Sequence, residues 1–259
     1  MKVRKVQQKR GWAIDLGVVI LKPALFATTR RTWVDGRKIP AEGGCIVVVN
    51  HVSHVDPLLT ALFVYDHGRI PRYLAKSGLF KNKVLAKYLT AAGQIPVERL
   101  SRTAMGAYDA AVAAVRGGEC VIVYPEGTLT RDPALWPMTG KSGAARIALE
   151  TGCPVIPVGH WGVQKILPPY SSKPRLIPPQ RVTMKAGDPV DLGDLVGKTR
   201  SAEAISEATA RIMAALTAIV EDLRGESAPA ERFDPRRMGV KQIGNPNKRR
   251  TRKKKGGTG

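Results

Sequence analysis

The stretch Cys45-Ile-Val-Val-Val-Asn-His-Val-Ser-His-Val-Asp-Pro57 joins a continuous apolar run to a polar cluster directly behind it. A run of apolar, mainly β-branched residues is typical of a strand buried on both faces, as in a parallel sheet covered by helices. Sites in α/β proteins lie at the carboxyl ends of such strands. The stretch therefore predicts a core strand that delivers polar side chains to a site.

The same alternation continues on both sides of this stretch. Short β-branched runs predict seven strands, at Thr32–Val34, Cys45–Val49, Arg72–Ala75, Gln94–Val97, Cys120–Tyr124, Val155–Val158 and Arg181–Ala186. Helices are predicted at Ser101–Arg116, Ser142–Thr151 and Ala202–Leu223, each with a glycine at or near its end. We therefore expect one α/β domain over residues 32–225, with a mixed central sheet flanked by helices.

The charge lies mainly at the two ends of the chain. The 259 residues carry 42 Lys and Arg against 21 Asp and Glu, a net charge of +21. Residues 1–31 hold eight basic and one acidic residue, and residues 226–259 hold eleven basic and three acidic ones. This distribution favours a globular domain held to an anionic surface over a uniformly basic nucleic-acid module. Residues 226–259 are predicted to be a disordered basic tail.

The N-terminal segment, residues 1–31, is predicted to associate with a membrane without crossing it. Its longest uninterrupted apolar run, Leu16–Leu21, is much shorter than the roughly 18 residues that span a bilayer. At helical spacing one face collects Trp12, Leu16, Val19, Ile20 and Phe26, with basic residues at both ends. This pattern indicates an amphipathic helix in the membrane interface. The alternative is that the face packs on the protein's own core.

The three cysteines are Cys45, Cys120 and Cys153. Each lies next to an apolar run, and none has a CxxC partner or a histidine at ligand spacing. We expect small, buried, reduced thiols, with no disulfide and no metal site.

The polar cluster after Val49 predicts a general base. If a helix begins near Asp56, its carboxylate can reach one imidazole nitrogen of His51, fix the tautomer and leave the other nitrogen to take a proton from a hydroxyl. Ser53 could instead be a nucleophile, but it lacks the Gly-x-Ser-x-Gly turn that exposes one. The other histidines are interpreted as surface residues or as support behind the site: His54, His67 and His160.

A second polar cluster, Tyr124-Pro-Glu-Gly-Thr128, follows another predicted strand. Gly127 would let the backbone approach a ligand closely, and Glu126 and Thr128 would present an acceptor and a hydroxyl. The segment Gly140-Lys-Ser142 ends like a phosphate-binding loop. The glycine that such a loop needs five positions earlier is Leu135, so nucleotide hydrolysis is not predicted.

These residues resemble the glycerolipid acyltransferases of the lysophosphatidic acid acyltransferase type, bacterial and in particular actinobacterial members most closely. Four sequence blocks of that family occur in order over about residues 32–190: an Asn-His-x-x-x-x-Asp motif, a basic residue followed by Phe or Leu, Gly and Arg, a Phe-Pro-Glu-Gly-Thr motif, and a strand with Ile-Pro-Val character. The matching residues are Asn50, His51 and Asp56, then Lys76, Leu79, Phe80, Gly93 and Arg99, then Tyr124–Thr128, and finally Val155–Val158.

The resemblance implies a glycerophosphate acyltransferase-like fold and a direct acyl transfer. It implies that His51 activates the free hydroxyl of a lysophospholipid, that Asp56 holds His51, and that the hydroxyl attacks an acyl thioester without an acyl-enzyme. It further implies that Arg99, with Lys76 as helper, neutralises the acceptor phosphate.

The third block carries the remaining implied site residues and one departure from the family. The resemblance implies that three residues line the acceptor site: Glu126, Gly127 and Thr128. The family usually has arginine directly after Thr128, where this chain has Leu129. We expect Arg131, two positions later, to take over that role.

The implied reaction moves an acyl group from acyl-CoA or acyl carrier protein to 1-acyl-glycerol 3-phosphate and forms phosphatidic acid. No cofactor and no metal are expected. The implied location is the cytoplasmic face of the cell membrane, where the protein would be peripheral and would contact an anionic membrane surface. Glycerol 3-phosphate or a glycolipid is an alternative acceptor. The alternative of another class, a basic nucleic-acid-binding protein, explains the net charge but not the order of the motifs, so no specific nucleic acid is expected.

Overall fold

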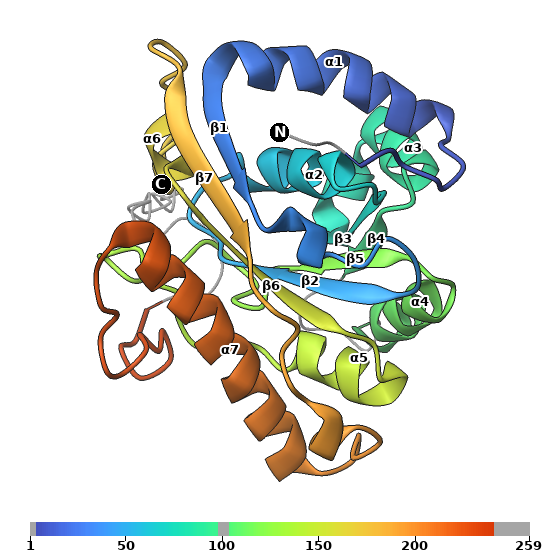
Figure 1. Cartoon of the computed structure of the whole chain (residues 1–259), viewed down its shortest axis with the longest axis vertical. Coiled ribbons are helices and arrows are strands. Elements are labelled where there is room, and N and C mark those ends of the chain that lie inside the picture. Colours follow the sequence, from blue (N-terminus) through green and yellow to red (C-terminus); the bar gives the residue numbers. More distant parts are fainter. Residues whose placement is uncertain (1–3, 98–103, 241–259) are drawn as a thin grey trace, which may run out of the picture.

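The computed structural model describes residues 4–97 and 104–240. Within these residues the core is a seven-stranded sheet in the order β1-β7-β6-β2-β5-β3-β4 (Figure 1). The strands are β1 (Thr29–Val34), β2 (Cys45–Val49), β3 (Pro71–Lys76), β4 (Ile95–Val97), β5 (Cys120–Val123), β6 (Val155–Trp161) and β7 (Gln180–Ala186). Among the strand pairs of the described residues, only β6–β7 is antiparallel. The prediction of one α/β domain with a mixed sheet is confirmed.

The central strand β2 joins the two halves of the hydrophobic core. All five of its residues are completely buried. Ile46 and Val48 face one core cluster, whereas Cys45, Val47 and Val49 face the other. Successive side chains of a strand alternate between the faces of a sheet, so an all-apolar strand needs cover on both sides. The sequence of β2 thus requires a layer of helices above the sheet and another below it.

Helices form these two layers (Figure 1). One layer contains α4 (Ala104–Arg116), α5 (Gly143–Thr151) and α7 (Ala202–Arg224), which match the predicted helices. The part of the predicted Ser101–Arg116 helix before Ala104 lies outside the described residues. The other side carries α1 (Trp12–Thr28), α2 (Asp56–Asp66) and α3 (Lys83–Ala91). The helices α2, α3 and the short α6 (Val163–Ile166) were not among the predicted ones.

Helix α1 forms where the sequence predicts it, and its predicted apolar face points away from the core. The five residues of that face are exposed by 43 to 70%: Trp12, Leu16, Val19, Ile20 and Phe26. The opposite side of the helix is held to the domain by the buried Ala13 and Leu25 and by an ion pair from Lys22 to Asp66. In the described residues, every helix falls short of the length or the apolar character that a membrane span requires.

The first part of the predicted tail, residues 226–240, makes contacts with the domain. The backbone N–H of Thr139 donates to the carbonyl of Phe233 at 3.0 Å, and that of Ala228 donates to the Glu221 carboxylate at 2.7 Å. Pro235 is buried. These contacts join Ala228 and Phe233 to the domain and satisfy part of the backbone hydrogen bonding of the segment. Residues 241–259 lie outside the described residues.

Candidate active site

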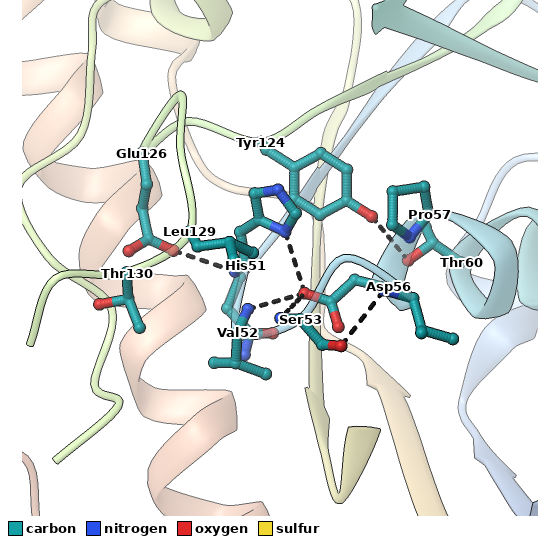
Figure 2. A network of polar contacts seen from close by, with 12 residues as sticks. His51, Val52, Ser53, Asp56, Pro57, Thr60, Tyr124, Glu126, Leu129 and Thr130 are labelled. Carbon is teal, nitrogen blue, oxygen red and sulfur yellow. Dashed lines mark hydrogen bonds and ion pairs between the residues drawn. The ribbon is translucent and has the colours of Figure 1, made fainter. Parts of the chain in front are cut away.

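The predicted pair of His51 and Asp56 forms in the turn between β2 and α2. Asp56 is the first residue of α2, and its Oδ2 accepts the backbone N–H groups of Val52 at 2.7 Å and Ser53 at 2.8 Å. The same oxygen lies 3.0 Å from Nδ1 of His51 (Figure 2). An ionised carboxylate only accepts, so Nδ1 carries the proton and Nε2 is left as a proton acceptor.

His51 lines a cavity of about 1000 Å³. The walls are mainly apolar and come from α1, α2, β3 and α3. These elements contribute, among others, Leu21, Leu58, Leu74 and Leu89, respectively. The His51 side chain is 15% exposed, whereas Asp56 is completely buried behind it. This arrangement can hold an apolar chain and bring a hydroxyl to the unprotonated nitrogen of His51, as general-base catalysis requires.

Tyr124 supports the imidazole ring from the side (Figure 2). The two rings lie 4.3 Å apart between centroids at an angle of 31°. The Tyr124 hydroxyl is 3.2 Å from the Thr60 hydroxyl. Burial raises the pKa of Tyr124 well above its ordinary value, so the phenol stays protonated. The family motif has phenylalanine at this position, and the ring is the part of the side chain that contacts His51.

Glu126 holds the backbone of the base. Its Oε1 accepts the backbone N–H of His51 at 3.0 Å (Figure 2), and its Oε2 accepts that of Met138 at 3.1 Å. Burial raises the pKa of Glu126 to about 8, although both backbone hydrogen bonds act in the opposite direction. The side chain is 1% exposed and is not among the residues that line the cavity. Its contacts hold the backbone of His51 and of Met138 behind the cavity wall.

The neighbouring residues of the third block divide between the cavity wall and the layer behind it. Thr128 and the buried Leu129 line the cavity. Gly127 has a φ of +70°, a backbone conformation that favours glycine. Arg131 is 7% exposed, and its guanidinium lies over the ring of Tyr170 at 4.7 Å. Tyr170, not Arg131, lines the cavity.

The two cations of the second block differ in what the structure shows. Lys76, at the end of β3, is exposed and lines the cavity. The structure thus brings Lys76, Thr128 and His51 to one cavity. Arg99 lies outside the described residues.

The other histidines and Ser53 differ in their exposure and in their position relative to the cavity. His54 is exposed and lines the cavity, but the surface interpretation is wrong for His67 and His160, which are both buried. Ser53 is buried, and its Oγ donates to the Leu167 carbonyl at 2.8 Å, so it is not presented as a nucleophile. Over residues 4–97 and 104–240, no group of three or more His, Cys, Asp or Glu side chains is arranged to hold a metal ion.

His160 supports the site from behind, which is one of the two interpretations that the sequence allowed. Its Nε2 lies 2.9 Å from the Asn50 carbonyl and 3.6 Å from Oδ2 of Asp56. A histidine two positions after the Ile-Pro-Val strand is a polar residue in an otherwise apolar run. Such a residue is expected to have a buried partner, and this was the signal that the sequence offered.

The chain is similar to proteins named as acyltransferases. The chloroplastic 1-acyl-sn-glycerol-3-phosphate acyltransferase BAT2 of Brassica napus is 33% identical over 125 residues, which are 48% of this chain and 35% of that protein. The 1-acyl-sn-glycerol-3-phosphate acyltransferase of Bacillus subtilis is 27% identical over 173 residues, which are 66% of this chain and 79% of that protein. The chain spans between about a third and a half of the length of its plant and Borreliella burgdorferi relatives.

The fold has a counterpart among solved structures. The crystal structure of PlsC, the 1-acyl-sn-glycerophosphate acyltransferase from Thermotoga maritima, matches with a TM-score of 0.58 and 23% identity, over 83% of this chain and 84% of that chain. A model of the acyltransferase family matches residues 31–161, just over half of the 259 residues, and this region contains His51, Asp56 and Glu126. The chain therefore belongs to the acyltransferase family.

Proposed function

We propose that this protein transfers an acyl group from an acyl thioester to the free hydroxyl of 1-acyl-glycerol 3-phosphate and so forms phosphatidic acid. The observation that carries the proposal is the pair of His51 and Asp56 at the wall of a large apolar cavity. The names of the relatives, 1-acyl-sn-glycerol-3-phosphate acyltransferases, support the choice of acceptor.

The chemistry follows from the tautomer of His51. The hydroxyl of the acceptor gives its proton to Nε2 while its oxygen attacks the thioester carbonyl. The imidazolium that forms is stabilised by the Asp56 carboxylate 3.0 Å away. When the C–S bond breaks, the thiolate takes this proton, and the products are an ester and a thiol. The acyl group passes directly from the thioester to the acceptor, and no serine hydroxyl or cysteine thiol carries it in between.

The phosphate of the acceptor is proposed to bind at the mouth of the cavity. Lys76 lines the cavity and is exposed, so its ammonium can reach a phosphate there without a large desolvation penalty. Arg99 is proposed to join it, as in the family motif. The stacking of Arg131 on Tyr170 supports an indirect role, in which Arg131 holds a wall residue of the acceptor site.

The protein is further proposed to be peripheral at an anionic membrane surface. The exposed face of α1 is one part of that surface, and α3, with Val84 81% exposed and Leu85 39% exposed, is the other. Residues 68–97 contain no Asp or Glu, and in the described parts of the chain Lys81, Lys83 and Lys87 form no ion pair. Apolar side chains among unpaired lysines suit an interface with anionic lipid. Both helices also line the cavity, which favours entry of the acceptor from the membrane.

We propose acyl-CoA or acyl carrier protein as the acyl donor. Acyl-CoA and acyl carrier protein are both cytoplasmic thioesters, so the proposed location is the cytoplasmic face of the cell membrane. The three free cysteines fit a reducing compartment.

Mass spectrometry of the products tests the reaction. The purified full chain is offered acyl-CoA or acyl carrier protein together with 1-acyl-glycerol 3-phosphate, glycerol 3-phosphate or a lysoglycolipid, one pair at a time. Phosphatidic acid from the first acceptor is the expected product. Product only from glycerol 3-phosphate or from the glycolipid would replace the acceptor, and folded protein that makes no ester from any pair would refute the proposal.

A further inference from the structure

We propose that His160 is a positioning residue for the acyl transfer, which fixes the backbone that carries His51. This inference rests on the proposed function. It starts from the register of β6 beside β2, in which Val158 pairs with Val49. The next residue, Asn50, follows the end of β2, and its side chain continues the pairing with β6. Oδ1 of Asn50 accepts the backbone N–H of His160 at 2.9 Å, and Nδ2 of Asn50 donates to the backbone carbonyl of His160 at 3.1 Å.

The imidazole of His160 closes this connection. Its Nε2 lies 2.9 Å from the backbone carbonyl of Asn50. A carbonyl only accepts, so Nε2 must carry the proton and donate it. Burial lowers the pKa of His160, and the neutral ring is therefore the form present near pH 7. Asn50 thus makes three hydrogen bonds to a single residue, and both residues are completely or almost completely buried.

The ring of His160 also lies near the carboxylate that holds His51. Nε2 of His160 is 3.6 Å from Oδ2 of Asp56, which is too long for a hydrogen bond but close enough for the N–H dipole to be attracted. A neutral donor in this place favours Oδ2 as the oxygen that faces His51. His160 therefore acts on the reaction through Asn50 and Asp56 and does not itself line the cavity.

The sheet order explains why two separate groups are needed. Strand β2 lies between β6 and β5. From the β6 side His160 holds Asn50, and from beyond the end of β5 Glu126 holds the N–H of His51. The peptide that joins Asn50 to His51 is thus fixed from both neighbouring strands. Loss of either support lets this peptide shift, and misplacement of a catalytic group by about 1 Å can lower a rate about 100-fold.

Steady-state kinetics of three variants test the role of His160. His160→Leu removes the donor, His160→Gln keeps an N–H that can reach the Asn50 carbonyl, and Met184→Ala changes a buried apolar residue that pairs with His160 in the β6–β7 register. We expect His160→Leu to lower kcat roughly 10- to 100-fold, while the Michaelis constants for both substrates stay within about two-fold of wild type. His160→Gln should recover most of this loss. Met184→Ala should lower the thermal midpoint but not kcat per folded molecule.

Three kinetic results would contradict the positioning role of His160. A kcat of His160→Leu near that of wild type, a His160→Gln variant as impaired as His160→Leu, or Michaelis constants that rise in step with the loss of kcat would each overturn the positioning role. Should His160→Leu not fold, nitrogen-15 NMR of the histidine rings in the wild-type chain decides: a neutral ring with the proton on Nε2 is expected, and a proton on Nδ1 or a charged ring at neutral pH would refute the geometry. Wild type without acyl transfer would instead refute the proposed function, and the NMR result would still stand.

Discussion

Oδ2 of Asp56 lies 3.0 Å from Nδ1 of His51 and accepts the N–H groups of Val52 and Ser53 as well. One oxygen therefore holds both the ring of the base and the turn that carries it. The turn can form only when the carboxylate is in place, because two buried backbone donors would otherwise lack a partner. Removing the base and removing its partner should accordingly have different consequences.

Removal of the imidazole should abolish the reaction and leave the fold. We expect His51→Ala to lower the initial rate of ester formation by ~10²–10⁴-fold, because that is the usual contribution of a general base. The far-UV circular dichroism spectrum should not change, since His51 is at the cavity wall. His54→Ala, at an exposed residue of the same wall, is the matched control and should keep the wild-type rate within about two-fold. Equal losses in both variants would contradict the assignment of His51 as the base.

Replacement of the carboxylate should affect both the rate and the stability. In Asp56→Asn the amide oxygen can still accept, but the neutral side chain cannot stabilise the imidazolium. We expect a loss of at least about ten-fold in kcat and a lower midpoint of urea unfolding, because a neutral amide oxygen is a weaker acceptor than a carboxylate for the two buried backbone N–H groups. Kinetics and urea titration of the same preparation measure both. An Asp56→Asn variant with wild-type kcat would leave Asp56 as a purely structural residue of the turn.

Glu126 should make the protein less stable as the pH rises from acid to neutral. Burial raises the pKa of Glu126 from 4.5 to about 8, so the folded state keeps a proton that the unfolded chain has already lost. The resulting stability is complete below pH 4.5 and disappears as the pH rises through about 8. The free energy of unfolding of wild type, relative to the non-titrating Glu126→Gln, should fall across this window by up to about 1.4 kcal/mol per pH unit. Urea unfolding of both proteins across the window measures the difference, and a constant or rising difference would contradict the raised pKa.

The strands could be predicted from the sequence because buried strands consist of short runs of apolar, mainly β-branched residues. Cys45–Val49 is apolar at every position, and such a run leaves few alternatives to a core strand. Helix α3 was missed although its apolar residues recur at helical spacing, at Val84, Leu85, Tyr88 and Leu89. None of its residues is buried, and the cavity lies beside the helix instead of the packed core. The signal in the sequence was Asn82, whose side chain caps the helix by accepting the N–H groups of Val84 and Leu85.

From residue spacing alone, the site could be predicted only where it is local in the chain. Lys76 and Thr128, which line the same cavity as His51, were predicted through the family resemblance. His51 and Asp56 are five residues apart, and their contact follows from a turn into a helix. The contacts of His51 with Glu126 and of Asn50 with His160 join residues 75 and 110 positions apart. They exist because β2 lies between β5 and β6. Strand order is a property of the packed sheet, and no spacing in the sequence specifies it.

Lys76 should contribute to binding of the acceptor and not of the donor. We expect Lys76→Ala to raise the Michaelis constant for the lysophosphatidic acid acceptor roughly ten-fold or more, since a hydrogen bond to a charged group contributes ~1.5–3 kcal/mol. The Michaelis constant for the acyl thioester should change much less. Lys81→Ala is the matched control, because Lys81 is also exposed but does not line the cavity. Equal increases of both constants would indicate that Lys76 binds the donor or shapes the cavity mouth.

The exposed faces of α1 and α3 should determine binding to anionic vesicles. The double variant Val19→Asp with Phe26→Asp places charge on the exposed face of α1, and Val84→Asp does so on α3. We expect the first to release the protein in a flotation assay and the second to weaken binding, because a charge in the interface loses the burial of apolar surface. Val196→Asp is the control, since Val196 is exposed but lies beside α5 on the other side of the sheet.

Deletion of residues 241–259 separates the membrane interpretation from the nucleic-acid one. This segment contains eight basic residues and no acidic one. Since each basic residue near an anionic surface contributes at most ~1 kcal/mol, the deletion should reduce the salt dependence of vesicle binding but leave binding itself, which the apolar faces of α1 and α3 maintain. A nucleic-acid-binding protein would show the reverse: strongly salt-dependent binding to RNA or DNA that needs the deleted segment, and vesicle binding that is indifferent to Val19, Phe26 and Val84. Flotation and nucleic-acid titration of the full-length and truncated chains decide between the two interpretations. The membrane interpretation predicts that the truncated chain still binds vesicles, and the nucleic-acid interpretation predicts that it no longer binds RNA or DNA.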